Sequence, residues 1–378
     1  MVSVVGFYKS EDEKRMWVKF GNEFEAVSIK KLFALKSRVS HLENISSVVR
    51  HELFSMSLYK NNDFFKYLSE ITWHRYAYVI YDRYYCFVSH RRIKDAKIQK
   101  ILIPHDSYSL ACERAIKVEK KIASKISWFF KKLVYIKLEK QAKVQFDLIM
   151  PVSKVDVGVF EQYPGKAKIA DFGIPISKKI WSVTHSYRED DDKLNILIHG
   201  SFGVSPVYQS FVDCFDRVYS RIRHNYPQVE FTIWSRNFHS CISDLSKLNG
   251  VKIVTWVDDY YSMLNSADIY LYPQIYCSGI QTKLRDAMAI GLPCVARAET
   301  LVPLLVTGNN IAYCVNNDDE MIDALSELIE SSDRRRIVGE NAKRHIFDNF
   351  NDANLKKKLY NTIDSLSSIS KSSNSVSL

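Results

Sequence analysis

Short β-rich runs alternate with amphipathic helical stretches along most of the chain, and this alternation limits the fold more than any other feature. In the first half, the pattern predicts buried strands at residues 78–81, 100–104 and 147–151, and a long helix at 111–144. In the second half, it predicts strands at 194–199, 230–234, 252–255, 269–272 and 293–296, with helices between them at 207–225, 260–265 and 282–290. Strands that alternate with helices are typical of parallel α/β sheets. The chain is therefore expected to form two Rossmann-like units.

The length also favours two domains, because 378 residues exceed the usual size of about 100–200 residues per domain. We place the first domain at residues 1–176 and the second at 177–350, with a polar linker at 177–193. A last helix, at about 352–366, is expected to pack back on the first domain.

The two ends of the chain give weaker patterns. Two strands are predicted near the start, at residues 1–6 and 24–32, although no glycine-rich turn follows either of them. The serine-rich stretch at 365–378 is expected to be frayed, as chain ends often are.

Charge is divided unevenly along the chain, whose total net charge is +10. Residues 1–175 hold 31 basic and 19 acidic residues, a net charge of +12, whereas the remaining residues hold 22 and 24, a net charge of −2. An anionic partner is therefore expected to meet the first half. Its most basic stretch surrounds Trp128, Phe129 and Phe130 and contains nine lysines: Lys117, Lys120, Lys121, Lys125, Lys131, Lys132, Lys137, Lys140 and Lys143.

A basic helix with aromatic residues is typical of a membrane surface contact. The alternative is a solvated helix face with a few buried aromatic residues. A nucleic-acid partner is not expected, because the chain has no recognisable DNA- or RNA-binding module.

Several classes of protein are excluded by what the sequence lacks. No apolar run approaches the roughly 20 residues that a membrane-spanning helix needs. The first residues have neither a basic segment nor a long apolar segment, so no secretory leader is expected. The seven cysteines are scattered without a C-x-x-C pair, which disfavours a zinc knuckle or a disulfide framework. We expect a reduced, cytoplasmic protein in which most of these thiols are buried as small apolar groups.

The most informative stretch, at residues 272–296, reads YPQIYCSGIQTKLRDAMAIGLPCVA. It predicts a strand end, a loop with Ser278 and Gly279, and then a helix. A helix N-terminus presents unpaired N–H groups and a partial positive charge, which suit an anion. Lys283 adds a full charge at this point, and Asp286 is placed to accept hydrogen bonds from hydroxyl groups such as those of a ribose. The pattern indicates a nucleotide site, and the alternative is a surface loop with a Lys–Asp helix pair.

The run SGIQTKLRDAMAIGLPCVA resembles the donor-site signature of the GT-B glycosyltransferases, in particular family 4 and its relatives. Upstream, VKIVTWVDDYYSMLNSADIYLYP resembles the family's strand, turn and following segment, and NILIHGSFGVSP resembles the first strand of its nucleotide domain. The resemblance covers residues 194–350 well and 76–175 loosely. It implies an α/β GT-B fold with two Rossmann-like domains that face a central cleft, the nucleotide-sugar donor binding to the second and the acceptor to the first.

The resemblance implies ten donor-binding residues: Gly200, Ser201, Trp256, Val257, Ser278, Gly279, Gln281, Thr282, Lys283 and Asp286. The chain departs from the family at two places. Ser278 stands where the family often has the first of two glutamates, the second being represented by Asp286. The turn after the first strand of this domain lacks the family's usual Arg and Lys, so Lys283 is expected to be the one cation of this domain near the donor's diphosphate.

His105 follows the predicted strand at 100–104 directly. In related enzymes a histidine at such a strand end faces the cleft, so the resemblance implies that His105 is catalytic. It would contact the transferred sugar or the acceptor and help to move a proton. Asp106 is expected to orient this imidazole or to cap the next helix. The alternative for His105 is a structural role.

No metal ion and no cofactor are expected. The run Asp190-Asp191-Asp192 contains a D-x-D pattern but lies in the polar linker before a strand, and Asp258-Asp259 has no third ligand nearby. Lys283 and the helix N-terminus are expected to neutralise the diphosphate in place of a metal ion.

The expected activity is the retaining transfer of a sugar from a nucleotide-sugar to a lipid-linked or saccharide acceptor. The expected pathway is surface-polysaccharide or glycolipid assembly, in the cytoplasm at the anionic inner face of the cell membrane. Two alternatives stay open. One is a nucleotide-sugar epimerase of the same fold, and the other is a degenerate GT-B subunit that binds a partner, as Ser278 and the atypical residues 1–75 allow.

Overall fold

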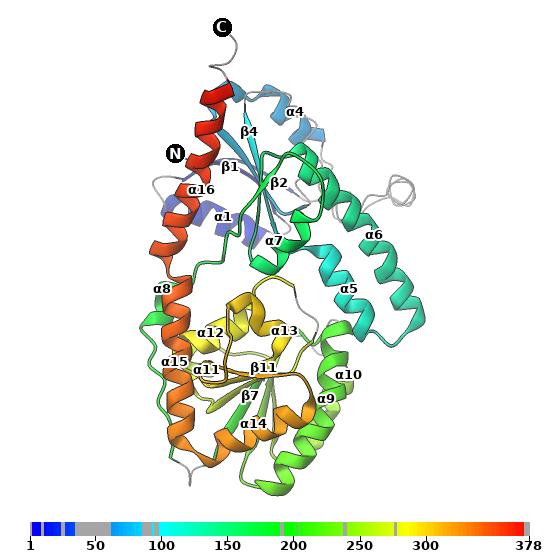
Figure 1. Ribbon diagram of the computed structural model, residues 1–378, viewed down its shortest axis with the longest axis vertical. Coiled ribbons are helices and arrows are strands. Elements are labelled where there is room, and N and C mark those ends of the chain that lie inside the picture. The colour runs from blue at the N-terminus through cyan, green and yellow to red at the C-terminus, as the bar shows by residue number, and fades with distance from the viewer. Residues whose placement is uncertain are drawn as a thin grey trace. The chain divides into compact units, whose positions relative to one another are not determined.

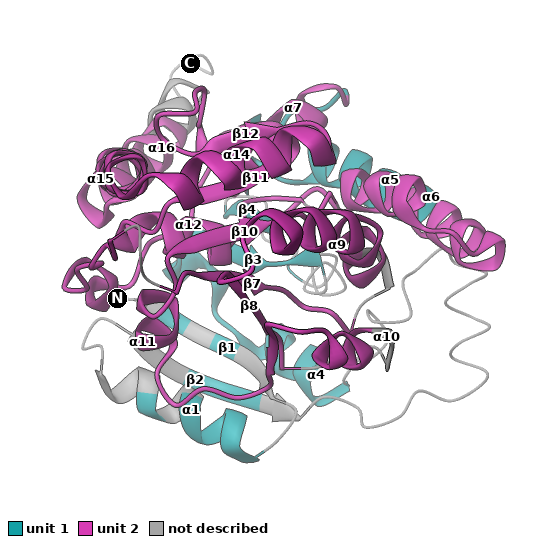
Figure 2. Cartoon of the chain, turned by 90° about the horizontal axis from the view of Figure 1, so that it is seen from below, with its two compact units in different colours: residues 1–105, 133–150, 164–168 teal, residues 106–132, 151–163, 169–378 magenta. Residues whose placement is uncertain are grey.

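The computed structural model (Figure 1) describes residues 2–8, 11–23, 27–34, 62–84, 93, 98–189, 193–203, 205–236, 240–275 and 278–373. The chain divides into two compact units, coloured separately in Figure 2. Unit 1 consists of Met1–His105, Leu133–Met150 and Pro164–Lys168. Unit 2 consists of Asp106–Lys132, Pro151–Tyr163 and Ile169–Leu378. The expected domain boundary between residues 176 and 177 stays a prediction.

Unit 1 contains two parallel sheets. Its first sheet pairs β1 (Val2–Tyr8) with β2 (Val27–Ala34), and α1 (Glu11–Glu23) connects them. Both strands predicted near the start of the chain are therefore confirmed, with shifted bounds. Residues of α4 (Asn62–Glu70), including Phe64 and Leu68, pack with Val5 and with Trp73 of the 3-10 helix η1 (Trp73–Arg75).

The second sheet has the strand order β3-β4-β5-β6. Its strands are β3 (Tyr78–Asp82), β4 (Gln99–His105), β5 (Leu148–Pro151) and the short β6 (Lys168–Ile169). The three strands predicted in this half are confirmed. Because β3 and β4 pair in parallel, their carboxyl ends, Asp82 and His105, lie at the same edge of the sheet.

The single helix predicted at residues 111–144 is wrong, because this stretch forms two helices, α5 (Tyr108–Val118) and α6 (Ile122–Gln145). The interruption is local. Glu119 is buried in an extended conformation, and its Oε1 accepts hydrogen bonds from the backbone N–H groups of Lys120 and Lys121 at 3.0 and 3.1 Å. These bonds satisfy amide groups that have no partner at the start of α6. The periodicity of the sequence did not reveal this break.

Unit 2 is built on a six-stranded parallel sheet with the order β12-β11-β10-β7-β8-β9. The strands are β7 (Asn195–His199), β8 (Glu230–Trp234), β9 (Val251–Val254), β10 (Ile269–Tyr272), β11 (Cys294–Arg297) and β12 (Tyr313–Val315). All five strands predicted here are confirmed. From β7 the chain builds outward to β8 and β9, then returns to the other side of β7 with β10. Ligands of open parallel sheets bind at the carboxyl ends of the strands beside such a reversal.

Helices cover both faces of this sheet (Figure 1). Successive residues of β7 alternate between two cores: Ile196 and Ile198 belong to one buried cluster, and Leu197 belongs to the other. The first cluster also takes in α9 (Ser205–Asn225) and α14 (Asp318–Glu330), and the second takes in α12 (Thr282–Ile290) and α15 (Ser332–Phe350). The remaining elements of unit 2 are shorter or peripheral: α7 (Lys154–Glu161), α8 (Lys178–Trp181), α10 (Ser240–Ser243), η3 (Asp244–Lys247), α11 (Tyr260–Asn265), α13 (Ala298–Leu301) and η4 (Val302–Leu304).

The last helix, α16 (Asp352–Ser373), is longer than expected. Its side chain Leu366 is buried, which gives the serine-rich stretch an apolar anchor. The expectation of a frayed end is therefore wrong up to Ser373, and residues 374–378 lie outside the described residues. Within unit 2, Lys358 of α16 forms an ion pair with Asp171. The packing of this helix on the first domain stays a prediction.

Four cysteines in the described residues carry free thiols, of which Cys112, Cys214 and Cys294 are buried and Cys314 is partly buried. The acidic run at residues 190–192 lies outside the described residues. No helix of the described ranges has both the length and the apolar character needed to cross a membrane.

Candidate functional site

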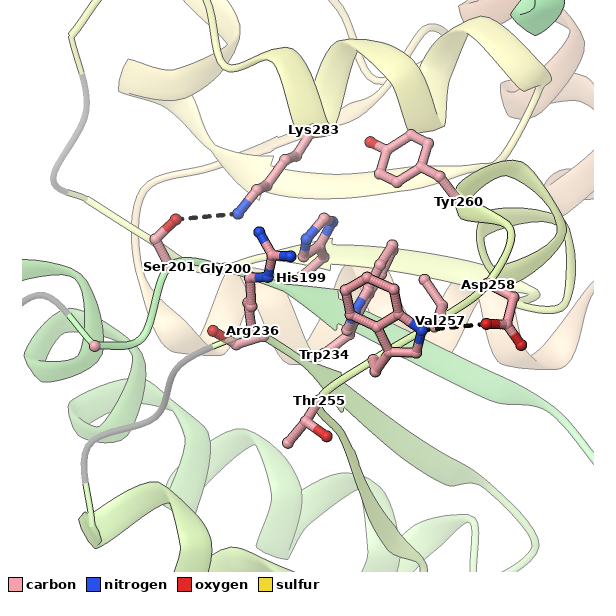
Figure 3. A pocket seen from close by; sticks show the side chains of 13 residues that line it. His199, Gly200, Ser201, Trp234, Arg236, Thr255, Val257, Asp258, Tyr260 and Lys283 are labelled. Carbon is pink, nitrogen blue, oxygen red and sulfur yellow. Dashed lines mark hydrogen bonds between the residues drawn. The ribbon is translucent and has the colours of Figure 1, made fainter. Parts of the chain in front are cut away.

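A pocket of about 520 Å³ lies at the carboxyl ends of β7, β8 and β9 (Figure 3). This volume suits a small-molecule ligand, for which pockets of roughly 300–1,000 Å³ are usual. The lining comes from these strand ends, from the turns that follow them, and from the starts of α11 and α12. It consists of His199, Gly200, Ser201, Gly203, Trp234, Ser235, Arg236, Thr255, Trp256, Val257, Asp258, Tyr260 and Lys283.

Lys283 reaches the pocket from the first turn of α12. Its Nζ donates a hydrogen bond to Ser201 Oγ at 3.2 Å. Burial lowers the pKa of Lys283 to about 8, and no carboxylate of the described residues offsets this effect. A partly buried ammonium group without a carboxylate partner is costly unless an anion binds beside it. The pocket therefore presents an ammonium group whose charge an anionic ligand would neutralise.

Arg236 adds a second positive charge to the pocket. It follows β8, and its side chain points toward Lys283 (Figure 3). Its guanidinium carbon lies 5.3 Å from the centre of the Trp256 ring, a cation–π contact. The sequence pattern predicts one cation near the ligand of this unit, whereas the pocket holds two.

An aromatic stack forms another part of the wall. The imidazole of His199 lies 3.9 Å from the ring of Trp234, with an interplanar angle of 15°. Burial, with the charge of Lys283 as a smaller cause, lowers the pKa of His199 to about 3, so the ring is neutral at physiological pH. Among the described residues, its Nδ1 has no hydrogen-bond partner. His199 therefore offers the pocket an uncharged polar nitrogen.

The sequence-based reasoning missed His199, Trp234 and Arg236, although a signal for them exists. His199 and Trp234 end predicted strands, and Arg236 stands two residues after the end of one. The carboxyl ends of neighbouring parallel strands meet at one edge of a sheet, which would have placed these side chains together.

Five of the ten predicted donor-binding residues line the pocket: Gly200, Ser201, Trp256, Val257 and Lys283. The other five do not: Ser278, Gly279, Gln281, Thr282 and Asp286. Asp286 accepts a hydrogen bond from the hydroxyl of Tyr260 at 3.3 Å and pairs with Arg285 at 2.9 Å. Asp286 therefore contacts the pocket only indirectly, through the lining residue Tyr260. Burial raises the pKa of Asp286, and the pairing with Arg285 opposes this shift.

The loop at Ser278 and Gly279 is held by two aspartates of unit 2. Ser278 Oγ donates to Asp106 Oδ2 at 3.1 Å. The buried Asp156 accepts hydrogen bonds from the backbone N–H groups of Ser107, at 2.9 Å, and of Gly279. Gly279 has a φ of +59°, and a Cβ at this position would lie 1.8 Å from Asp106 Oδ1. Only glycine fits this loop without displacement.

Gln281 fixes the same loop from its other end. Its side-chain amide donates to the carbonyl oxygen of Ser278 at 2.9 Å and accepts from the hydroxyl of Tyr272 at 2.7 Å. Thr282 begins α12 directly afterwards. The loop thus has a defined shape where β10 leads into the helix that carries Lys283.

His105 lies in unit 1, at the carboxyl end of β4. Its Nε2 is 2.6 Å from Asp82 Oδ1, and its φ of +66° is unusual for a residue with a side chain. Such conformations cost energy and cluster at functional sites. Asp82 makes this contact with the ring, and Asp106 accepts a hydrogen bond from Ser278. The residue that caps the next helix, α5, is Ser107 and not Asp106, because Ser107 Oγ accepts from the backbone N–H of Leu110. The catalytic role of His105 stays a prediction.

Comparison with known sequences finds a family match within the second half of the chain. Residues 193–331 match the family model described as glycosyl transferases group 1. A curated relative, an uncharacterized glycosyltransferase of Methanocaldococcus jannaschii, is 25% identical over 260 residues. That match covers 62% of this chain and 62% of the relative, so it spans less than two thirds of the relative's length.

Solved structures extend the likeness to nearly the whole chain. A sucrose-phosphate synthase from Thermosynechococcus elongatus matches with a TM-score of 0.68 and 10% identity, over 98% of this chain and 100% of that one. HepE of Anabaena, solved with UDP and glucose, matches with a TM-score of 0.64 and 13% identity, over 97% of this chain and 100% of that one. At such identities the likeness shows the fold.

The two parallel α/β units and the pocket at a sheet reversal define a GT-B protein with two Rossmann-like domains. Within this fold, residues 193–331 are similar to the group 1 glycosyltransferases.

Proposed function

We propose that this protein is a glycosyltransferase whose unit 2 pocket binds a nucleotide-sugar donor. The observation that carries the proposal is the pair of cations in this pocket, Lys283 and Arg236. Lys283 is partly buried, and within the part of the chain that the structure describes no carboxylate neutralises it. A donor's diphosphate supplies the complementary charge. The presence of UDP and glucose in the structure of HepE, which shares this fold, supports a nucleotide donor of this class.

In the proposed transfer, the bond between the anomeric carbon of the sugar and the terminal phosphate oxygen breaks. Its electron pair leaves with the diphosphate, where Lys283 and the start of α12 stabilise the negative charge that develops. The acceptor's hydroxyl oxygen bonds to the same carbon, and its proton passes to the departing phosphate oxygen. We propose that the new bond forms on the face that the diphosphate leaves, with retention, because the donor-site sequence resembles the retaining family 4.

We propose His105 as the catalytic residue of unit 1, through a hydrogen bond to the transferred sugar or to the acceptor hydroxyl. The contact with Asp82 at 2.6 Å supports this role, because it fixes the orientation of the imidazole. The left-handed backbone at His105 supports it further.

We propose that the transfer needs no metal ion. The pocket has two cationic side chains of its own. Within the described ranges, no group of three His, Cys, Asp or Glu side chains is placed to hold a metal. Transfer should therefore continue in the presence of EDTA, and activity that depends on added Mg²⁺ or Mn²⁺ would contradict this proposal.

We propose a lipid-linked or saccharide acceptor of surface-polysaccharide or glycolipid assembly, met at the cytoplasmic face of an anionic membrane. The support comes from α6, where large apolar side chains are exposed at one-face helical spacing: Ile122 (76%), Ile126 (52%), Phe129 (51%) and Phe130 (62%). Lysines flank them, among them Lys131, whose Nζ lies 4.3 Å from the centre of the Trp128 ring. The exposure of Phe129 and Phe130 disfavours a helix face with buried aromatic residues.

A donor screen tests the proposal. Nucleoside diphosphates and their sugar conjugates are added to the full chain, and thermal unfolding is followed. A ligand at about 100 times its Kd should raise the free energy of unfolding by about 2.7 kcal/mol. The stabilising nucleotide-sugar is then incubated with a lipid extract, and both the released nucleoside diphosphate and the labelled product are measured.

The outcomes separate the three candidate functions. Sugar transfer that requires the extract supports a glycosyltransferase. Isomerisation of the donor without any acceptor would instead show an epimerase. Donor binding without release of nucleoside diphosphate in any extract would indicate a subunit that has lost catalysis.

A further inference from the structure

We infer that Asp156, a buried residue outside the pocket, is a positioning residue for sugar transfer, because it holds the loop at Ser278 and Gly279 in the shape that the transferred sugar meets. The inference deepens the proposed function and rests on it. It adds a residue that acts on the sugar end of the donor without touching the nucleotide.

The side chain of Asp156 joins three segments of unit 2. It is fully buried, although a buried carboxylate is costly unless hydrogen bonds compensate for it. Its Oδ1 accepts from the backbone N–H of Ser107 at 2.9 Å, and the carboxylate also accepts from the backbone N–H of Gly279 and from Ser153 Oγ. One carboxylate thus connects the start of α5, the start of α7 and the loop before α12.

Helix capping does not account for all of these bonds. The cap of α7 is Ser153, whose Oγ accepts from the backbone N–H of Asp156 at 3.2 Å. The cap of α5 is Ser107, whose Oγ accepts from the backbone N–H of Leu110 at 3.3 Å. Serine hydroxyls therefore cap both helices. The bond from Gly279 to Asp156 serves the loop instead.

The loop fits closely against the segments that hold it. Gly279 is buried with a φ of +59°, and a Cβ there would lie 1.8 Å from Asp106 Oδ1 and 3.1 Å from Val152 Cγ2. Ser278 Oγ donates to Asp106 Oδ2 at 3.1 Å. The buried N–H of Gly279 would lose its acceptor without Asp156, which is costly for a backbone group. Asp156 therefore fixes the path of the loop backbone.

The place of this loop beside Lys283 indicates what it does for transfer. Lys283 lines the pocket from the first turn of α12, whereas Ser278 and Gly279, just before this helix, do not line it. The sugar of a donor is attached to the outer phosphate, so it extends beyond the diphosphate that Lys283 is proposed to bind. The loop adjoins Lys283 outside the pocket and meets this sugar.

Helix α12 is anchored separately from the loop, because most of its residues after Lys283 are buried. Loss of the Asp156 carboxylate should therefore shift the loop and leave Lys283 in place. A shift of about 1 Å in a group that positions the substrate lowers the rate of reaction by about 100-fold. The expected effect is on transfer and not on nucleotide binding.

The test compares the full chain with Asp156→Asn, which keeps the shape of the side chain and removes its charge. The control is Ser331→Ala, which removes the cap of α15, whose Oγ accepts from the backbone N–H of Arg334, and does not touch the loop. The probes are the nucleotide-sugar that stabilises the chain most in the donor screen and its nucleoside diphosphate. Calorimetry gives both affinities, transfer to the lipid extract gives kcat and KM, and hydrogen exchange reports opening of residues 278–281.

Asp156→Asn should lower kcat by about 10- to 100-fold. Its affinity for the nucleoside diphosphate should stay within about two-fold of the wild type. Amide exchange at residues 278–281 should become faster. Ser331→Ala should unfold at a lower temperature and keep its kcat within about two-fold. If Asp156→Asn is not folded at the assay temperature, Ser278→Ala decides, because it releases the loop from Asp106 and should lower kcat with the same unchanged diphosphate affinity.

The inference is overturned if folded Asp156→Asn, or Ser278→Ala in its place, transfers sugar as fast as the wild type. It is also overturned if kcat and diphosphate affinity fall together, which would make Asp156 a structural residue of the whole unit. An equal loss of kcat in Ser331→Ala would show that lower stability alone explains the effect. A wild type that binds no nucleotide-sugar would refute the proposed function and this inference together.

Discussion

At the scale of single residues, the charge on Lys283 is expected to determine how tightly the pocket binds an anion. Burial lowers the pKa of this ammonium group to about 8, so it loses its proton as the pH rises through that value. Donor affinity should therefore be highest below about pH 8 and fall above it. Lys283→Ala should cost about 1.5–3 kcal/mol of binding free energy at pH 7.

Isothermal titration of the nucleoside diphosphate between pH 6.5 and 9.5 measures this dependence. Lys283→Arg is the control, since an arginine stays protonated over this range and should flatten the profile. A wild-type affinity that does not change with pH, or an unaltered affinity in Lys283→Ala, would remove Lys283 from the site.

The pair of His105 and Asp82 leads to a second prediction at this scale. His105→Ala should reduce turnover more than donor affinity, because the residue belongs to unit 1 and is proposed to meet only the transferred sugar or the acceptor. Asp82→Asn keeps the shape of the side chain and removes its charge, so it should lower turnover by a smaller factor. Donor affinity that falls in parallel with turnover in either variant would indicate a structural role.

At the scale of elements, the loop before α12 depends on a glycine. Gly279→Ala places a Cβ 1.8 Å from Asp106 Oδ1 at a φ of +59°, so it should lower the free energy of unfolding by about 1–3 kcal/mol. A Cβ at Gly158, inside α7, would meet no heavy atom of another element within 4 Å, so Gly158→Ala should be neutral or stabilising by about 0.5–1 kcal/mol. Urea unfolding measures the free energy of unfolding of the two variants. Equal changes in this free energy would contradict the prediction.

A further prediction at this scale is that the protein binds anionic membranes through the basic helix α6. The full chain should bind anionic vesicles and ignore neutral ones, and binding should weaken from low to high salt. Replacing the exposed Lys121, Lys125 and Lys131 with Glu should lower the partition coefficient by at least about 100-fold, since each lysine contributes about 1 kcal/mol.

Co-sedimentation with vesicles measures this binding. The matched control replaces three exposed lysines elsewhere in unit 2, Lys252, Lys356 and Lys357, with Glu. Both triple variants should keep the wild-type nucleotide affinity. Equal loss of vesicle binding in the two variants would show that binding depends on the net charge of the protein and not on α6. A wild type that does not bind anionic vesicles at low salt would show that α6 is a solvated helix and not a membrane contact.

At the scale of the whole molecule, the donor site is contained in one continuous part of the chain. Every residue that lines the pocket lies between His199 and Lys283. A fragment of residues 177–373 should therefore bind the nucleoside diphosphate but transfer no sugar, because it lacks His105. It also lacks α5, which packs on α9, and Asp106, which holds the loop at Ser278.

Calorimetry measures whether this fragment binds the nucleoside diphosphate, and a transfer assay measures whether it transfers sugar. Binding without transfer would support the predicted domain boundary. A fragment that does not fold would show the boundary to be wrong and would indicate that α5 and α7, which cluster with unit 2, belong to its folding unit.

The sequence alone determined most of the elements, because their signals are local. The strands at Glu230–Trp234 and Ile269–Tyr272 and the helices at Tyr260–Asn265 and Thr282–Ile290 have the predicted bounds. Periodicity, turn residues and helix starts lie within a few positions of one another, so a short window contains them. Lys283 was singled out for the same reason, since its place beside a helix start is visible in the sequence, and the structure places it in the pocket lining.

Only the tertiary structure decided which distant residues meet. Arg236 and His199 join Lys283 because β8 pairs with β7, and Asp82 reaches His105 because β3 pairs with β4. Parallel pairing brings the ends of strands together across long stretches of chain, and the choice of neighbouring strands is made by packing of the whole sheet rather than by any local run of residues.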